Sequence, residues 1–168
     1  MNEGLLCECR MPLVWREASL DNHARETAMR EAALLLAAIN QMESSHDLEP
    51  GGPENRRLDR LEAKLDLALH LLARALEPVG APAPRLVRLG AEAVEWEDAQ
   101  APVEGAALIL ELRPSDALPL TLKLPAQALA PVADRARARF VGLSETLNDV
   151  LVQFVFRRHR QAIRARSA

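Results

Sequence analysis

Apolar residues in the first part of the chain recur at helical spacing. Between residues 17 and 45 they alternate in steps of four and three, at Ala28, Ala32, Leu35, Ile39 and Met42. This spacing is the a/d seam of a heptad pattern and predicts a long helix over 17–45. The stretch 32–39 is apolar around the whole circumference, which is typical of a helix surrounded by protein.

A second long helix is predicted over residues 56–77. At about 100° per residue, six leucines fall in an arc of roughly 80°, namely Leu58, Leu61, Leu65, Leu69, Leu72 and Leu76. Leu67 and Leu71 fall on the opposite side. A helix that covers one core needs one apolar stripe, so the second stripe needs another partner. A helix from another copy of the chain is the simplest candidate, and a larger intramolecular core is the alternative.

The pattern changes after residue 84, where a Pro- and Gly-containing stretch ends the helical spacing. Apolar residues then alternate with a period of two, which predicts short strands at 85–89, 93–97, 105–112, 118–124 and 135–141. The arginines of the last segment share one face. Short strands separated by turns favour a small antiparallel sheet or barrel.

A closing helix is predicted after Ser144, which is a good N-cap residue. Apolar residues that should pack on the barrel follow at helical spacing, at Leu147, Leu151, Phe154 and Val155. The end of this helix is basic and includes Arg157, Arg158 and Arg160. This patch has three readings: a solvated helix end favoured by the helix dipole, a docking site for an acidic protein, or a site for an anionic nucleotide or lipid.

Composition narrows the class of protein. The 168 residues suffice for a core without a disulfide or metal staple, and Cys7 and Cys9 are expected to be free thiols. A net charge of −3 and the absence of Tyr argue against nucleic acid as a partner. No apolar run resembles a signal peptide or a membrane span. We therefore expect a soluble cytoplasmic protein without a metal or cofactor.

Catalytic patterns are missing from the sequence. The histidines are scattered over both helices, the linker between them and the tail, and neither a nucleophile elbow nor a glycine-rich phosphate loop is present. The acidic residues form no carboxylate pair with a spacing that suggests acid–base catalysis. We therefore expect a protein that is not an enzyme.

The order of the predicted elements, together with the closing pattern Phe154-x-Phe156-Arg157-Arg158-His159-Arg160, resembles a PilZ domain. The two helices inserted ahead of the barrel look like the atypical, tetramer-forming branch of that family. The resemblance implies an α+β fold: residues 1–16 supply an N-terminal strand, 17–78 form a two-helix oligomerisation segment within a helical bundle, and 79–168 form a small antiparallel β-barrel with a closing helix.

The resemblance also implies a nucleotide site. Typical PilZ domains bind cyclic di-GMP through an Arg-x-x-x-Arg pair and an [Asp/Asn]-x-Ser-x-x-Gly turn. By position this turn falls at residues 88–93, where Arg88, Gly90 and Ala93 occupy the three signature positions. The ordinary site is therefore degenerate. Three Arg-x-x-x-Arg spacings, at Arg56/Arg60, Arg135/Arg139 and Arg160/Arg164, leave an altered cyclic di-GMP site as the alternative.

These features together favour a homo-oligomer, most simply a tetramer, that acts through a protein partner. The family resemblance implies a role in type IV pilus function, motility or virulence. Oligomerisation is assigned to the seam of the first helix and the leucines of the second: Leu35, Ile39, Met42, Leu58, Leu61, Leu65, Leu67, Leu69, Leu71, Leu72 and Leu76.

Overall fold

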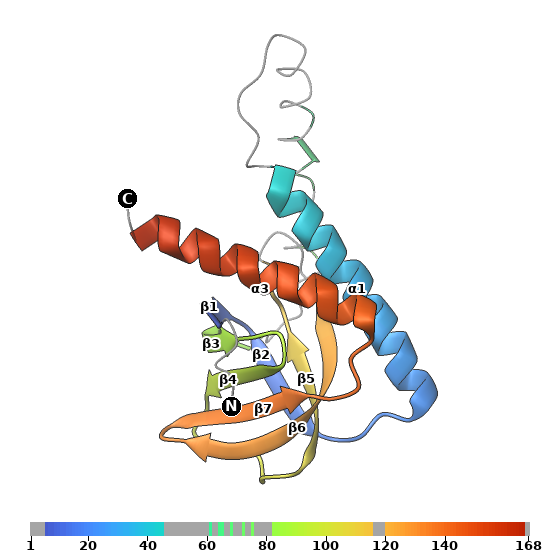
Figure 1. The fold of residues 1–168 in the computed structure, drawn as a ribbon, viewed down its shortest axis with the longest axis vertical. Helices are drawn as coiled ribbons and strands as arrows, with labels where there is room; N and C mark the ends of the chain where they lie inside the picture. The colour runs from blue at the N-terminus through green and yellow to red at the C-terminus, as the bar shows by residue number, and fades with distance from the viewer. Residues whose placement is uncertain are drawn as a thin grey trace.

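The computed structural model describes residues 6–45, 82–115 and 120–166, together with the single positions 61, 64, 65, 68, 72 and 75. Within these ranges one antiparallel sheet is covered by two long helices, α1 (Asn22–Ser45) and α3 (Glu145–Arg166). The two helices contact each other where they cross, and their C-terminal ends diverge (Figure 1).

The sheet of the described residues has seven strands in the order β1-β3-β4-β7-β6-β5-β2, and all neighbours are antiparallel. The strands are β1 (Cys7–Met11), β2 (Leu13–Glu17), β3 (Arg85–Leu89), β4 (Ala93–Glu97), β5 (Ala107–Leu112), β6 (Leu122–Val132) and β7 (Arg135–Phe140). The N-terminal segment supplies both edges of this sheet, because β1 pairs with β3 and β2 pairs with β5.

The predicted barrel is wrong in one respect, since the sheet is not closed. β1 and β2 are separated only by Pro12 and lie at opposite ends of the strand order. Antiparallel pairing of two consecutive strands needs a turn of about two residues or more, and one proline cannot provide it. The edge strands β1 and β2 are therefore connected only through the backbone at Pro12, and they form no hydrogen-bonded ladder with each other.

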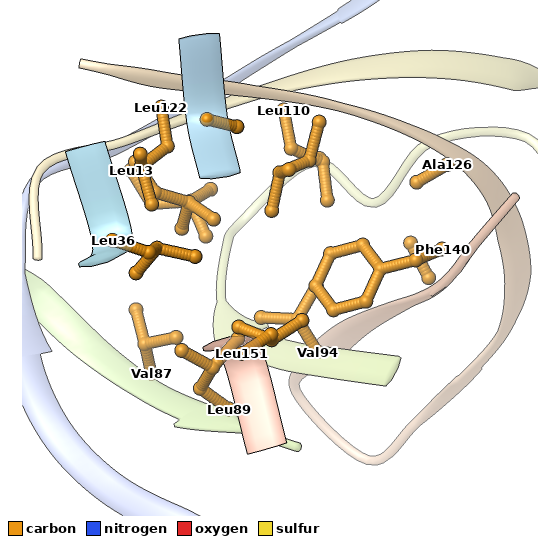
Figure 2. Packing of buried hydrophobic residues seen from close by; sticks show 14 of the residues in the cluster. Leu13, Leu36, Val87, Leu89, Val94, Leu110, Leu122, Ala126, Phe140 and Leu151 are labelled. Atoms are coloured by element: carbon orange, nitrogen blue, oxygen red, sulfur yellow. The ribbon is translucent and has the colours of Figure 1, made fainter. Parts of the chain in front are cut away.

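One core lies between the sheet and the two helices. Figure 2 shows Leu36 of α1 and Leu151 of α3 pointing toward side chains of the sheet such as Val87 and Leu89. The predicted packing of the closing helix is confirmed, because the four apolar residues assigned to it are buried: Leu147, Leu151, Phe154 and Val155. Trp96 is the largest fully buried side chain, with 0% of its surface exposed.

Capping side chains fix the N-terminal ends of both helices. α3 begins as predicted after Ser144, whose Oγ accepts a hydrogen bond from the Leu147 amide at 3.2 Å. α1 begins at Asn22, five residues later than predicted, because Asp21 caps it: Asp21 Oδ1 accepts a hydrogen bond from the Ala24 amide at 2.8 Å.

The strands at 85–89 and 93–97 are confirmed with the predicted bounds. β6 differs most from its prediction, because it begins at Leu122 and continues to Val132 through Pro125 and Pro131. Proline ordinarily interrupts a ladder. Here Pro125 opposes Ile109, and its carbonyl accepts a hydrogen bond from the Val141 amide at 3.1 Å.

The β6–β7 turn holds a strained alanine. Ala133 has a φ of 56°, in the left-handed region that L-residues other than glycine rarely adopt. We expect Ala133→Gly to raise the free energy of unfolding by about 0.5–1 kcal/mol, because glycine has no Cβ to strain there. Ala130→Gly, at an exposed position of β6, should lower it instead. Urea denaturation measures both, and a loss of stability in Ala133→Gly would contradict this account of the turn.

Candidate functional site

Residues 88–93, where the family pattern predicts a degenerate turn, run from the end of β3 to the start of β4. The Gly90 amide donates to the Ala93 carbonyl at 2.8 Å. Arg88, which stands where the family pattern has Asp or Asn, donates from Nε to Glu8 Oε2 at 3.0 Å. Its Nη1 also lies 4.0 Å from Glu95 Oε2. The guanidinium is therefore held between two carboxylates.

Arg88 belongs to a row of alternating charges that crosses four strands. The register places Glu8 opposite Arg88, Arg88 opposite Glu95, and Glu95 opposite Arg137. Glu95 Oε1 lies 3.2 Å from Arg137 Nε. Cross-strand pairs of opposite charge contribute about 0.2–1 kcal/mol each. A phosphate that approached Arg88 would therefore also meet the carboxylates of Glu8 and Glu95.

Of the two Arg-x-x-x-Arg spacings within the described residues, neither places both of its arginines at the turn, since Arg139 opposes Ala93 in the register but Arg135 opposes Glu97. Arg135 and Arg139 lie on β7 with Arg137 between them, so their side chains share the outer face as predicted. Arg139 Nη2 donates to Gln127 Oε1 at 2.6 Å. Arg160 and Arg164 lie on α3, while Arg56 and Arg60 fall outside the described residues.

The arginines of the basic patch predicted at the end of the closing helix differ in their environments: two form ion pairs with α1, and one is exposed. Arg157 Nη2 lies 3.0 Å from Glu43 Oε2 and 2.6 Å from Asn40 Oδ1. Arg158 Nη2 donates to Glu43 Oε1 at 2.8 Å and to the Pro114 carbonyl at 2.8 Å. These two arginines therefore hold α3 against α1. Arg160 remains exposed, with its guanidinium carbon 5.9 Å from the centre of the Phe156 ring.

Glu43 is the residue on which this contact between α1 and α3 depends. Its side chain is 21% exposed, and those of Arg157 and Arg158 are 15% and 29% exposed. We expect Glu43→Gln to lower the free energy of unfolding by about 2 kcal/mol, because two half-buried guanidiniums lose their counter-charge. Glu31→Gln, at an exposed position of α1, should change it by less than about 0.5 kcal/mol. Equal stabilities of the two variants in urea denaturation would contradict this role.

A pocket of about 280 Å³ lies between the diverging ends of α1 and α3. Three of its lining residues are arginines and none is acidic. The lining comprises Asn40, Gln153, Phe156, Arg157, Arg160, Gln161 and Arg164. This donor set suits a carboxylate or phosphate group, because guanidinium and amide N–H groups all donate hydrogen bonds.

Within the described residues, the carboxylate with the most side-chain hydrogen bonds is Asp98, and this cluster was not predicted from the sequence. Asp98 Oδ2 accepts hydrogen bonds from Trp15 Nε1 at 2.8 Å, from Trp96 Nε1 at 3.2 Å and from Arg85 Nη1 at 2.7 Å. Both tryptophans of the chain thus donate to one oxygen. Because Trp15 lies on the edge strand β2, Asp98 joins that edge to β3 and β4.

Within the described residues, the predicted oligomerisation residues fall into two groups, one buried and one exposed. Ile39 is 1% exposed and packs in the core of its own chain, and Leu35 is partly buried against that core. Leu61, Leu65 and Leu72 are helical and more than half exposed, at 56%, 59% and 53%. The side chain of Met42 lies outside the description, as do Leu58, Leu67, Leu69, Leu71 and Leu76.

The exposed leucines form a regular stripe. The described helical positions Leu61, Leu65, Ala68, Leu72 and Ala75 are separated by steps of four, three, four and three residues, and all five are exposed. This spacing is the a/d seam of a coiled coil, which is stable in water only when another helix covers it. We name these five residues the 61–75 stripe.

The two cysteines are free, as predicted. A hydrogen bond from Cys9 is the main cause that lowers the pKa of the buried Cys7 thiol, and burial opposes it. The same contact raises the pKa of Cys9. Within the described ranges, no group of three His, Cys, Asp or Glu side chains is placed to hold a metal ion. None of the helices described there is both long and apolar enough to cross a membrane.

Comparison with known proteins identifies relatives of the chain. A family model described as "Atypical PilZ domain, cyclic di-GMP receptor" matches residues 33–167. A solved structure of a pathogenic protein from Xanthomonas campestris is similar, with a TM-score of 0.76 and 28% identity over 97% of this chain and 92% of that chain. That protein is described as a tetrameric PilZ domain, self-assembled via an unusual helical bundle. A search of curated proteins found no match.

Proposed function

Because the chain belongs to the atypical PilZ domain family, we propose that it is a non-enzymatic, homo-oligomeric signalling or scaffold protein that acts through protein contacts. The observation that carries this proposal is the exposed 61–75 stripe, which an isolated chain would leave in water. The helical bundle described for the Xanthomonas protein supports the same use of the inserted helices. A tetramer is the proposed assembly.

The proposed mechanism does not use the ordinary nucleotide turn. Arg88 is neutralised by Glu8 and Glu95. Gly90 supplies no hydroxyl where the pattern has Ser, and Ala93 carries a Cβ where the pattern has Gly. The sheet and its closing helix α3 would then present the surface that contacts proteins. The proposed setting is the bacterial cytoplasm, in the regulation of type IV pilus function, motility or virulence that the family resemblance implies.

A second candidate is a cyclic di-GMP receptor with an altered site. The description of the matching family model as a cyclic di-GMP receptor favours it. Such a site would have to use other arginines, because the turn at Arg88 faces acidic neighbours.

Calorimetric titration with cyclic di-GMP separates the two candidates. We expect no saturable binding at micromolar nucleotide, because Arg88 at the turn is held between Glu8 and Glu95. The combined variant Arg88→Asn, Gly90→Ser, Ala93→Gly restores the turn pattern. It should also fail to bind tightly, because a specific anion site needs the arginine pair as well. Arg88→Asn is used in place of Arg88→Asp, because Asp would lie between Glu8 and Glu95.

Saturable micromolar binding by the unmodified chain would favour the altered-site receptor. Tight binding by the restored variant alone would show that an arginine pair, such as Arg56/Arg60, is already in position.

A further inference from the structure

Helix α3 has a second apolar face besides the one in the core. Three large apolar side chains on it are about half exposed: Val152 at 45%, Phe156 at 52% and Ile163 at 51%. At about 100° per residue they fall within an arc of roughly 40°. The buried residues of α3 lie on the other side of the helix, at Leu147, Leu151, Phe154 and Val155.

Positive charge borders the C-terminal half of this apolar face, whereas the exposed Glu145 and Asp149 lie at its N-terminal end. Arg160 and Arg164 are one turn apart and exposed, on the side of α3 that lines the pocket with Gln153. The guanidinium of Arg160 lies over the Phe156 ring. The chain as a whole has a net charge of −3, so this concentration of arginines beside apolar residues is local. We name Val152, Phe156, Arg160, Ile163 and Arg164 the outer face of α3.

The pocket between α1 and α3 makes this surface concave. Its inner wall includes Arg157, which is fixed by Glu43 and Asn40. Glu43 also binds Arg158, so its negative charge is already compensated and does not repel an acidic ligand. A carboxylate entering the pocket would therefore meet the exposed guanidinium of Arg160 next to the fixed side chain of Arg157.

We infer that the outer face of α3, with the adjoining pocket, docks an acidic amphipathic helix of a partner protein. From Val152 to Ile163 the apolar residues span twelve positions, about 16 Å or three helical turns, which is longer than a small anion needs. Leucine-like anchors on the partner would cover Val152, Phe156 and Ile163, and an Asp or Glu residue of the partner would pair with Arg160. This inference rests on the proposed function, because it names the chemistry of the protein partner.

A second copy of the chain suits this face less well. A stable protein–protein interface buries roughly 1,200–2,000 Å², and one three-turn helix face is small beside that range. Smaller interfaces are typical of transient signalling contacts. The small size of this face therefore favours a partner that binds reversibly.

Photo-crosslinking identifies what covers the face. The full-length chain carries benzoylphenylalanine in place of Phe156, and in a control in place of Val103, which is 71% exposed in the β4–β5 loop. Both are expressed in cells of the source bacterium and irradiated. We expect the chain labelled at position 156, and not the control, to crosslink to a segment with apolar residues at helical spacing and Asp or Glu beside them. Crosslinks only to other copies, only to non-acidic segments, or to nothing would overturn the inference.

Affinity measurements test the charge contacts. The crosslinked segment is synthesised, and its binding to the full-length chain is followed by fluorescence anisotropy. We expect Arg160→Glu to weaken binding about tenfold or more and Arg160→Lys to weaken it less. Arg30→Glu, at an exposed α1 position away from the pocket, should leave affinity within about twofold. Equal affinities of Arg160→Glu and Arg30→Glu would overturn the inference.

Light scattering on the same samples separates this inference from the proposed function. Arg160→Glu should keep the mass of the unmodified assembly. A lower mass would show that the face is an assembly contact and would overturn the docking inference. A monomeric mass for the unmodified chain would contradict the proposed assembly, while the peptide affinities still decide the docking site.

Discussion

Leu65→Asp is expected to dissociate the assembly, so that the particle mass falls toward the 18.5 kDa of one chain. Leu65 lies in the middle of the 61–75 stripe and is 59% exposed within its own chain. Removing a buried leucine costs about 2–5 kcal/mol, and a carboxylate in its place adds the cost of an unpaired buried charge. That penalty recurs in every protomer of a symmetric assembly.

The sheet and its two helices should survive this substitution, because Leu65 is absent from the hydrophobic core of the described residues. Circular dichroism should therefore retain the native spectrum of the sheet. Lys64→Asp is the matched control, since it introduces the same carboxylate at a neighbouring exposed position that already carries a charge. We expect it to keep the assembled mass. An assembled mass for Leu65→Asp, measured by light scattering at micromolar concentration, would contradict the assignment of the stripe.

Asp98→Asn is expected to cause the largest loss of stability among the conservative polar substitutions, about 2–3 kcal/mol. The amide has no negative charge for Arg85, which lies 2.7 Å from the carboxylate and is 30% exposed. It also offers the two indole N–H groups a weaker acceptor. Because Asp98 joins the β2 edge to β3 and β4, the substitution loosens the unclosed part of the sheet.

The same carboxylate makes stability depend on pH. Burial alone would raise the pKa of Asp98, but hydrogen bonds from Trp15, the Gln100 amide, Trp96 and Arg85 outweigh it and hold the pKa below 3.8. The stabilisation is therefore fully present above the ordinary pKa, near 3.9 for an unfolded chain, and is lost as the pH falls through the lower pKa of the folded chain.

Urea denaturation of the unmodified chain and of Asp98→Asn tests both expectations. The difference in free energy of unfolding should be constant near neutral pH and should shrink below about pH 4. Asp134→Asn, in the exposed β6–β7 turn, is the control and should show no comparable difference. A difference that persists unchanged at low pH would contradict the role of the Asp98 charge.

Elements that depend on local pattern could be predicted from the sequence. The strands 85–89 and 93–97 follow from alternation, and the start of α3 follows from Ser144. Closure of the sheet could not be predicted, because it depends on whether two strands separated by Pro12 pair with each other or with distant strands. Alternation describes the faces of a strand and not its neighbours.

The heptad seam of α1 shows a similar limit. Ile39 was assigned to an oligomer, and it packs in the core of its own chain. A seam indicates that a residue is covered, and the covering element has to be found in three dimensions. The hydrogen bonds on Asp98 could not be predicted from the sequence for the same reason, because Trp15 and Asp98 are 83 residues apart in the chain.

Helical spacing alone does distinguish the half-buried from the exposed arginines at the C-terminal end of α3. Arg158 follows Phe154 by four residues and Leu151 by seven, so helical spacing places it on the buried side of α3. Its partner Glu43 lies 115 residues earlier in the chain, which sequence spacing does not reveal. Arg160 falls on the opposite side by the same count and is exposed.

The central claim is that this chain assembles through its inserted helices and does so without the nucleotide of its family. Light scattering of the unmodified full-length chain, before and after addition of cyclic di-GMP, tests it most directly. The account predicts a mass of four times 18.5 kDa that the nucleotide does not change. A mass of 18.5 kDa, or a mass that depends on cyclic di-GMP, would contradict it.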